Sequence, residues 1–259
     1  MTNFDDIYKY LVDTANLISQ SRFGNKMVLK GGSVLMSKLT ECGRDDLKRI
    51  TRDLDIHCDK KEVWIDFYTN IESILNSNNL GYTYRITERR STKKGLDTSD
   101  SLRFTLNDKV NSKIIEFKID MNIKSNTIIT CDYSPILNMT TYDLNTSITD
   151  KIIVVSSKKV FRRIKDLYDI AVMTSICNFS YSDVQRHIVV KHGNVELTNM
   201  LIPENYEMLK HAYDLYKGIL NKPILENLVS IDLSFLEPFY IKYNGELVWD
   251  CQRAFWVKC

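Results

Sequence analysis

The sequence predicts an α/β (α+β) fold, with a mixed sheet and helices in the N-terminal half and a mostly helical C-terminal half. First, a short apolar run before Gly31-Gly32 indicates a strand, a tight turn and a helix. Second, the stretch from residue 82 to residue 121 alternates apolar and polar residues, which is typical of strands. Third, after residue 145 apolar residues recur at helical spacing. We therefore expect two domains, residues 1–145 and 146–259.

The first half contains both kinds of element. Apolar residues at helical spacing predict helices over residues 5–20 and 61–78. Ser33 is expected to cap a third helix that runs through Leu39. Strands are predicted over residues 26–29, 82–90, 102–106 and 114–121. A polar segment with Lys93, Lys94 and Gly95 is expected to form a loop.

The second half is assigned mainly by helical periodicity. Residues 147–150 have the form of a capping box and predict a helix start. The β-branched run 151–155 favours a strand instead, so its assignment stays open. Further helices are predicted over residues 160–177, 182–191 and 203–220. The aromatic tail, residues 235–259, has no clear periodicity.

Composition excludes several classes of protein. The chain has 259 residues and a formal net charge of +2, so any nucleic-acid site must come from local basic patches. No 18-residue apolar run predicts a transmembrane helix, and the acidic N-terminus does not resemble a signal peptide. The six cysteines lack CxxC spacing, and the four histidines are scattered, which argues against zinc. We expect reduced thiols in a cytoplasmic protein without a membrane partner.

Two short motifs suggest a site for nucleotide phosphates. Backbone N–H groups exposed by the turn at Gly31-Gly32, followed by the start of a helix, attract phosphate. Asp53 and Asp55 alternate along a predicted strand, so both point to one face and repel each other unless a cation lies between them. Either motif alone is more often an ordinary turn or a pair of solvated carboxylates. Their order along the chain favours a Mg²⁺ site opposite a phosphate-binding turn.

A third carboxylate would complete a two-metal site. Asp120 lies on a predicted strand whose apolar residues alternate with polar ones, and Glu116 shares its face and is the rival candidate. Taken alone, this pattern is slightly better explained as an ordinary polar strand face.

The predicted helix over residues 160–177 carries a polar face. Arg162, Lys165, Asp166 and Asp169 fall opposite its apolar stripe, and a solvated face with ion pairs explains that pattern adequately. Basic residues also cluster between residues 85 and 94 and between 158 and 165. Such clusters are usually solvated, although they would also suit a triphosphate or an RNA backbone.

Three motifs in order resemble those of a known family. Lys30 to Leu35 fit KGG-[ST]-x-L, and Arg49 to Asp55 fit R-x-[ST]-x-D-[IL]-D. Lys151 precedes a helix in which Lys165 to Ile170 read KDLYDI, matching a basic-D-L-Y-D-[IL] stretch. As a set they resemble the nucleotidyltransferase superfamily, and more closely the AbiEii/MenT-type toxins, also called type IV abortive-infection toxins.

The resemblance implies an enzyme that moves an NMP from an NTP to an acceptor, with residues 1–145 as the catalytic core and the C-terminal domain adding Lys and Asp motifs. Mg²⁺ (or Mn²⁺) would be held by Asp53, Asp55 and Asp120. Nucleotide contacts would come from Lys30, Gly31, Gly32, Ser33, Arg49, Thr51 and Lys151. The catalytic set would be Asp53, Asp55, Asp120, Lys151, Asp166 and Asp169. The choice between Asp166 and Asp169 for orienting Lys151 or acting on the acceptor hydroxyl stays open.

The same resemblance implies partners. The acceptor would be an RNA 3′ end such as that of tRNA, with a protein hydroxyl as the alternative, and the protein would be the toxin of a toxin–antitoxin or phage-defence system with a cognate antitoxin. Two other hypotheses remain. One is an NTP- or RNA-binding protein of the same fold without transferase activity, and the other is a toxin that acts by sequestering a partner.

Overall fold

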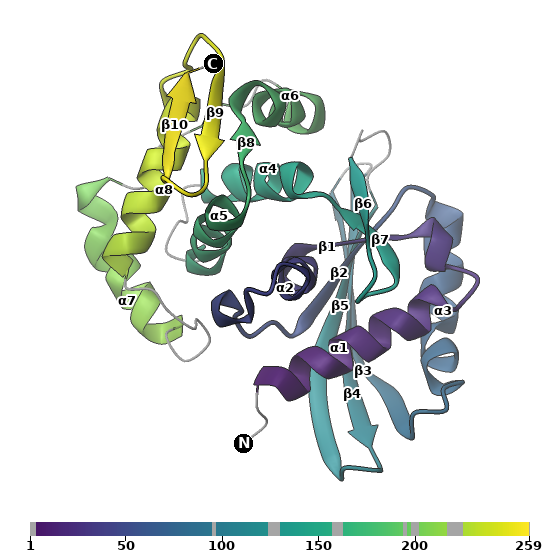
Figure 1. Ribbon diagram of the computed structural model, residues 1–259. Coiled ribbons are helices and arrows are strands. Elements are labelled where there is room, and N and C mark those ends of the chain that lie inside the picture. The colour runs from purple at the N-terminus through teal and green to yellow at the C-terminus, as the bar shows by residue number, and fades with distance from the viewer. Residues whose placement is uncertain are drawn as a thin grey trace. The chain divides into compact units, whose positions relative to one another are not determined.

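The computed structural model describes residues 4–94, 97–123, 130–156, 163–193, 196–197, 202–216 and 225–258. The chain divides into two compact units (Figure 1). The N-terminal unit comprises Met1–Glu41, Ile50–Thr127 and Cys131–Tyr142, and the C-terminal unit comprises Cys42–Arg49, Ile128–Thr130 and Asp143–Cys259. None of the helices in the described ranges is long and apolar enough to cross a membrane.

A mixed sheet forms the centre of the N-terminal unit. Its described strands number seven, in the order β3-β4-β5-β2-β1-β7-β6. They are β1 (Val28–Lys30), β2 (Asp53–Cys58), β3 (Tyr82–Lys94), β4 (Asp97–Asp108), β5 (Lys113–Ile123), β6 (Cys131–Ser134) and β7 (Met139–Tyr142). The strand β2 runs parallel to β5 and antiparallel to β1. The predicted mixed α/β architecture is therefore confirmed.

One face of this sheet is apolar and covered by two helices. The helices α1 (Phe4–Ser19) and α3 (Lys61–Asn76), both predicted, lie against the sheet (Figure 1). Both contribute buried residues to the same core as the sheet. Leu54 of β2, Phe104 of β4 and Ile119 of β5 are fully buried in that core. Because successive strand residues point to opposite faces, their polar neighbours point to the other face of the sheet.

Three predictions for the N-terminal half need correction. The helix α2 (Gly31–Glu41) begins at Gly31, so Ser33 lies within its first turn and does not cap it. Lys93 and Lys94 belong to β3 and not to a loop, because their strand pairs with β4 as far as Lys94 opposite Asp97; Gly95 lies outside the described residues. The predicted strand over 26–29 is shifted to Val28–Lys30. Two short 3₁₀ helices, η1 (Gly24–Lys26) and η2 (Asp45–Leu47), complete this part of the chain.

The C-terminal unit is mostly helical, as predicted. Its described helices are α4 (Leu144–Val155), α5 (Ile164–Ile176), α6 (Tyr181–His192), α7 (Tyr206–Tyr216) and α8 (Leu225–Tyr240), with a short 3₁₀ turn η4 (Pro203–Asn205). The aromatic tail forms β9 (Leu247–Asp250) and β10 (Phe255–Lys258), which join β8 (Phe179–Ser180) in a small antiparallel sheet. Trp249 of β9 and Phe235 of α8 pack edge to face, with 5.1 Å between their ring centroids.

The start of α4 differs from the prediction. The N-cap is Asp143, whose carboxylate accepts a hydrogen bond from the Thr146 N–H at 2.7 Å, so the capping box predicted at Ser147 is wrong. Residues 151–155 are helical. Ile152 and Val155 are buried, and this packing outweighs the weak helix propensity of β-branched residues. The next helix, α5, begins at Ile164, and residues 160–162 of its predicted range lie outside the described residues.

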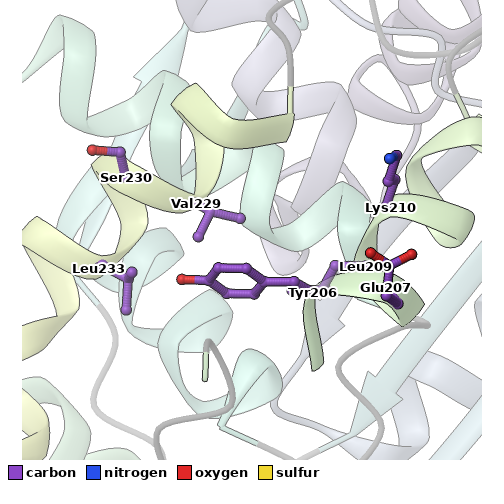
Figure 2. Close-up of a pocket in the computed structure, with 7 residues that line it drawn as sticks. All are labelled: Tyr206, Glu207, Leu209, Lys210, Val229, Ser230 and Leu233. Carbon is purple, nitrogen blue, oxygen red and sulfur yellow. The ribbon is translucent and has the colours of Figure 1, made fainter. Parts of the chain in front are cut away.

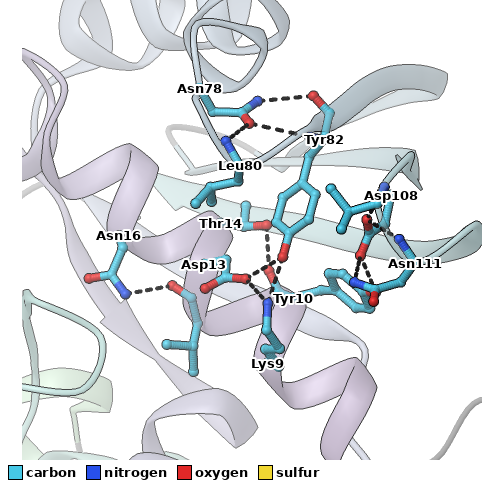
Figure 3. A network of polar contacts seen from close by, with 12 residues as sticks. Lys9, Tyr10, Asp13, Thr14, Asn16, Asn78, Leu80, Tyr82, Asp108 and Asn111 are labelled. Atoms are coloured by element: carbon cyan, nitrogen blue, oxygen red, sulfur yellow. Dashed lines mark hydrogen bonds and ion pairs between the residues drawn. The ribbon is translucent and has the colours of Figure 1, made fainter.

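A buried carboxylate fixes α1 to the β4–β5 turn (Figure 3). The Tyr10 hydroxyl donates to Asp108 Oδ2 at 2.7 Å, and Asp108 Oδ1 accepts from the N–H groups of Val110 and Asn111 at 2.9 and 3.0 Å. Burial alone would raise the pKa of Asp108, but the hydrogen bonds from Asn111, Tyr10 and Val110 lower this pKa to about 2. The ionised carboxylate therefore stabilises both the turn and the position of the helix.

We predict that Asp108→Ala lowers the free energy of unfolding by about 3 kcal/mol, because it removes several charge-assisted hydrogen bonds and leaves the Tyr10 hydroxyl unpaired. Asn107→Ala, one residue earlier and exposed, is the control and should change it by less than about 0.5 kcal/mol. Since the pKa of Asp108 is lower in the folded state, the loss of unfolding free energy caused by Asp108→Ala should reach its full size above about pH 4. It should shrink as the pH falls toward 2. Urea unfolding at several pH values measures it, and a difference independent of pH would contradict the assignment.

Candidate active site

The open face of the large sheet carries the predicted carboxylates. In the parallel pairing of β2 with β5, Asp53 lies opposite Lys118 and Asp55 lies opposite Asp120. All four side chains project from the face opposite α1 and α3, since the residues between them are buried under those helices. Neighbouring strands lie about 4.8 Å apart, so this register brings the carboxylates close together.

A lysine lies among these carboxylates. The Lys118 ammonium is 2.6 Å from Asp120 Oδ2 and 4.0 Å from Asp53 Oδ1. Burial alone would lower the pKa of Lys118, but its hydrogen bond to Asp120 and the charges of Asp53, Asp120 and Asp55 raise this pKa above its usual value. The ammonium thus offsets part of the repulsion between the carboxylates.

The glycine turn lies directly against Asp55. Gly31 has a φ of +76°, and a Cβ placed on it would lie 2.1 Å from Asp55 Oδ2. Only glycine allows this close approach and this backbone conformation. The first N–H groups of α2 lack partners within the helix, as at any helix start, so they are available to an anion. The Ser33 hydroxyl is buried and has no hydrogen-bond partner within the described part of the chain.

Two other predicted nucleotide-binding residues, Lys30 and Thr51, belong to the N-terminal unit. Lys30, the last residue of β1, lies with its ammonium 5.8 Å from the centroid of the Tyr142 ring. Thr51 is buried two residues before β2 begins. Neither placement tests nucleotide binding, so the nucleotide-binding roles of Lys30 and Thr51 remain predictions.

In the C-terminal unit, the predicted lysine and aspartates form one ion-pair cluster. Asp169 of α5 accepts a bidentate hydrogen bond from Arg49, with Nε at 2.6 Å and Nη2 at 2.7 Å. Lys151 of α4 lies 2.6 Å from Asp166 and 2.9 Å from Asp169. The Tyr168 hydroxyl donates to the Leu47 carbonyl at 2.8 Å, so the KDLYDI stretch also holds the segment that ends at Arg49.

The two aspartates of this cluster differ in exposure. The Asp169 side chain is completely buried, whereas Asp166 is 17% exposed. The interpretation of Asp169 as part of a solvated face is therefore wrong. Burial alone would raise the pKa of Asp169, but Arg49 and Lys151 lower this pKa to about 2. Burial would likewise lower the pKa of Lys151, but Asp169 and Asp166 raise it above its usual value.

The cluster also bears on the nucleotide role predicted for Arg49. The Arg49 guanidinium is bound to Asp169 and its side chain is 6% exposed. This contact fixes the segment leading to β2, and nucleotide binding by Arg49 remains a prediction.

The carboxylates of the N-terminal unit fit a divalent ion by chemistry more than by a preformed geometry. Hard carboxylate oxygens are the ligands that Mg²⁺ prefers. No three Asp, Glu, His or Cys side chains in the described ranges converge into a metal cluster. Instead, two of the three predicted ligands, Asp53 and Asp120, lie near the Lys118 ammonium. The carboxylate oxygens are therefore suitable ligands for Mg²⁺. A metal bound by Asp53 and Asp120 would lie next to the Lys118 ammonium.

A pocket of about 210 Å³ opens beside Asp53. Its lining residues are Arg52, Asp53, Arg103, Glu116, Phe117 and Lys118. Sequence reasoning gave no role to Arg52, Arg103 or Lys118; the alternation of Lys118 with Glu116 and Asp120 along one strand is the signal that could have found it. A second pocket of about 380 Å³, between α7 and α8, contains no predicted site residue (Figure 2).

Carboxylates on adjacent strands, next to a glycine turn that starts a helix, would suit a divalent ion and a phosphate group. A family model described as nucleotidyl transferase AbiEii toxin, type IV TA system, matches residues 15–228. The chain belongs to this family of nucleotidyltransferase toxins. No curated protein matches it.

Comparison with solved structures gives two matches. JHP933 from Helicobacter pylori is 15% identical with a TM-score of 0.51, and the match covers 91% of this chain and 90% of that chain. The Megavirus polyadenylate synthase is 8% identical with a TM-score of 0.31, and the match covers 98% of this chain and 46% of that chain. The likeness to JHP933 supports the fold alone.

We predict that Gly31→Ala abolishes nucleotidyl transfer, because its Cβ would force the Asp55 carboxylate to rotate away. Gly43→Ala is the matched control: Gly43 has a φ of +68°, but a Cβ there meets no atom within 4 Å. Both variants should lose about 1 kcal/mol of unfolding free energy from backbone strain, and Gly31→Ala should lose more because its Cβ displaces Asp55. Only Gly31→Ala should lose transfer. Equal loss of transfer in both variants would count against a special role for the Gly31–Asp55 contact.

We also predict that Asp169→Asn lowers the free energy of unfolding by about 3–5 kcal/mol, because it leaves Arg49 and Lys151 buried with too little negative charge. Asp166→Asn, at the more exposed carboxylate of the same cluster, should cost about 1 kcal/mol. Urea unfolding of both variants makes the comparison. Similar values would show that burial does not separate the two aspartates.

Proposed function

We propose that this chain is a Mg²⁺-dependent toxin that transfers an NMP from an NTP to the 3′ end of an RNA such as tRNA. The observation that carries the proposal is the β2–β5 register, which gathers Asp53, Asp55 and Asp120 on one sheet face beside the glycine turn of α2. Family membership supports nucleotidyl transfer by this core.

Each part of the N-terminal unit has a role in this proposal. Asp53, Asp55 and Asp120 hold the divalent ion, which when bound supplies positive charge to the α-phosphate and the leaving pyrophosphate. The N–H groups at the start of α2, from Gly31 onward, bind the β- and γ-phosphates. Lys30, which directly precedes the turn, and Thr51 contribute further contacts to the nucleotide.

The reaction is a displacement at phosphorus. The acceptor hydroxyl oxygen forms a bond to the α-phosphorus as the bond from that phosphorus to the bridging oxygen of the β-phosphate breaks. Pyrophosphate leaves with the electron pair, and the hydroxyl proton passes to a carboxylate or to water. The charge that develops on the phosphate oxygens is what the cationic groups of the chain must stabilise.

In the C-terminal ion-pair cluster, the buried and the partly exposed aspartate are proposed to have different roles. Asp169, buried between Arg49 and Lys151, fixes the structure around it. Asp166, which is partly exposed, orients Lys151, and Lys151 adds positive charge toward the triphosphate. The family model spans residues 15–228, so it includes both this cluster and the carboxylates, which supports a need for both in one reaction.

The proposed acceptor is an RNA 3′ end, and the proposed protein partner is a cognate antitoxin. An RNA end is favoured over a protein hydroxyl because Arg52, Arg103 and Lys118 line the pocket beside Asp53 and suit a phosphodiester backbone. A type IV toxin also has a cognate antitoxin, which we expect for this chain in the cytoplasm.

We predict that Asp53→Asn lowers nucleotidyl transfer by about a thousandfold or more, because it removes a carboxylate from the proposed metal site. The assay supplies each α-³²P-labelled NTP with Mg²⁺ and total RNA, and detects label in RNA. Asp120→Asn should cause a similar loss, whereas Glu116→Gln, on the same strand face, should keep most activity. A large loss of activity in Glu116→Gln and a small one in Asp120→Asn would show that Glu116 is the third carboxylate.

The labelling assay, an NTP-binding measurement and a growth assay together separate the other hypotheses. Label in protein and not in RNA would show that the acceptor is a protein hydroxyl. Mg²⁺-dependent NTP binding without any product would indicate a binding protein, and growth arrest that survives Asp55→Ala would indicate sequestration of a partner.

A further inference from the structure

We propose that Lys118 is an internal counter-ion that competes with the divalent metal for Asp120 and Asp53, and so sets the metal concentration at which the site fills. Lys118 is thus a positioning residue that acts through the carboxylates. This inference rests on the proposed metal site.

The placement of Lys118 follows from the strand register. Lys118 lies directly opposite Asp53 and two residues before Asp120 on the same face of β5. Its ammonium reaches both carboxylates, at 2.6 Å from Asp120 and 4.0 Å from Asp53. A side chain within ion-pair distance of two proposed metal ligands is therefore itself a cation.

The ammonium and a divalent ion cannot both keep this position. Mg²⁺ lies about 2.1 Å from its oxygen ligands. A metal on Asp120 would therefore lie within a few ångströms of an ammonium that is 2.6 Å from the same carboxylate. Like charges at that separation repel strongly even in a partly hydrated site. If the metal takes Oδ2, the oxygen that Lys118 contacts, its binding includes release of Lys118 from Asp120.

The structure offers Lys118 another partner. Its side chain is 33% exposed and lines the pocket beside Asp53 together with Glu116. Glu116 is two residues earlier on the same strand face, is exposed, and makes no ion pair within the described ranges. A rotation of the long lysine side chain is enough to exchange one carboxylate for the other.

The neighbouring basic residue provides a matched control. Arg103 lies opposite Lys118 on β4 and lines the same pocket, but its guanidinium pairs with Glu88 at 3.3 Å. Removing Arg103 subtracts the same charge from the same face without vacating Asp120. The two substitutions therefore separate direct competition from a general change in potential.

The test is a titration of the full-length chain with Mn²⁺, followed by the EPR signal of the free ion, without any substrate. Lys118→Met should bind Mn²⁺ about fivefold more tightly than the wild type, a factor typical of losing a partly exposed ion pair. Lys118→Arg should stay near the wild-type value, and Arg103→Met should change it by less than about twofold. Circular dichroism of each variant verifies that it is folded.

Two outcomes would overturn the inference while leaving the metal site intact: unchanged affinity in Lys118→Met, or equal tightening in Lys118→Met and Arg103→Met. A different control tests the site itself. If the Asp120→Asn variant binds Mn²⁺ as tightly as the wild-type chain does, Asp120 is not a ligand. The proposed metal site then fails independently of Lys118.

Discussion

The parallel pairing of β2 with β5 determines which side chains share a face of the large sheet. It places Asp53 and Asp55 opposite Lys118 and Asp120, while Leu54 and Ile119 are buried on the other side. A shift by one residue would send the carboxylates into the core and the apolar residues into solvent, so the burial of the intervening residues fixes the register. The chemistry of the open face is thus fixed by the packing of the closed one.

The second constraint is the burial of opposite charges in the C-terminal unit. Asp169 is fully buried, and only the bidentate contact from Arg49 and the ammonium of Lys151 keep it ionised there. The adjacent Tyr168 binds the Leu47 carbonyl. The family motif therefore has two physical parts: Tyr168 and Asp169 hold the segment 42–49, and Asp166 contacts the lysine.

Local patterns in the sequence predicted what depends on neighbours along the chain. The alternation of Asp53 with Leu54 and Asp55, and the glycine turn before α2, were visible without any tertiary information. The missed features depend on distant residues. The cap of α4 is Asp143 because packing sets where that helix starts, and Asp169 is buried because Arg49, 120 residues earlier, reaches it. The ion pairing of Lys118 required the strand order, which no local pattern contains.

Each unit contains a lysine bound to a carboxylate that belongs to the proposed reaction, and the two pairs differ in how firmly they are held. Lys151 contacts two carboxylates and is 17% exposed, so release would leave buried charges without partners. Lys118 is 33% exposed and its main partner Asp120 is 24% exposed, so water and Glu116 can replace the contact. Equal chemistry in two environments therefore gives two behaviours. We therefore expect the buried lysine to stay in place and the exposed one to exchange with another cation.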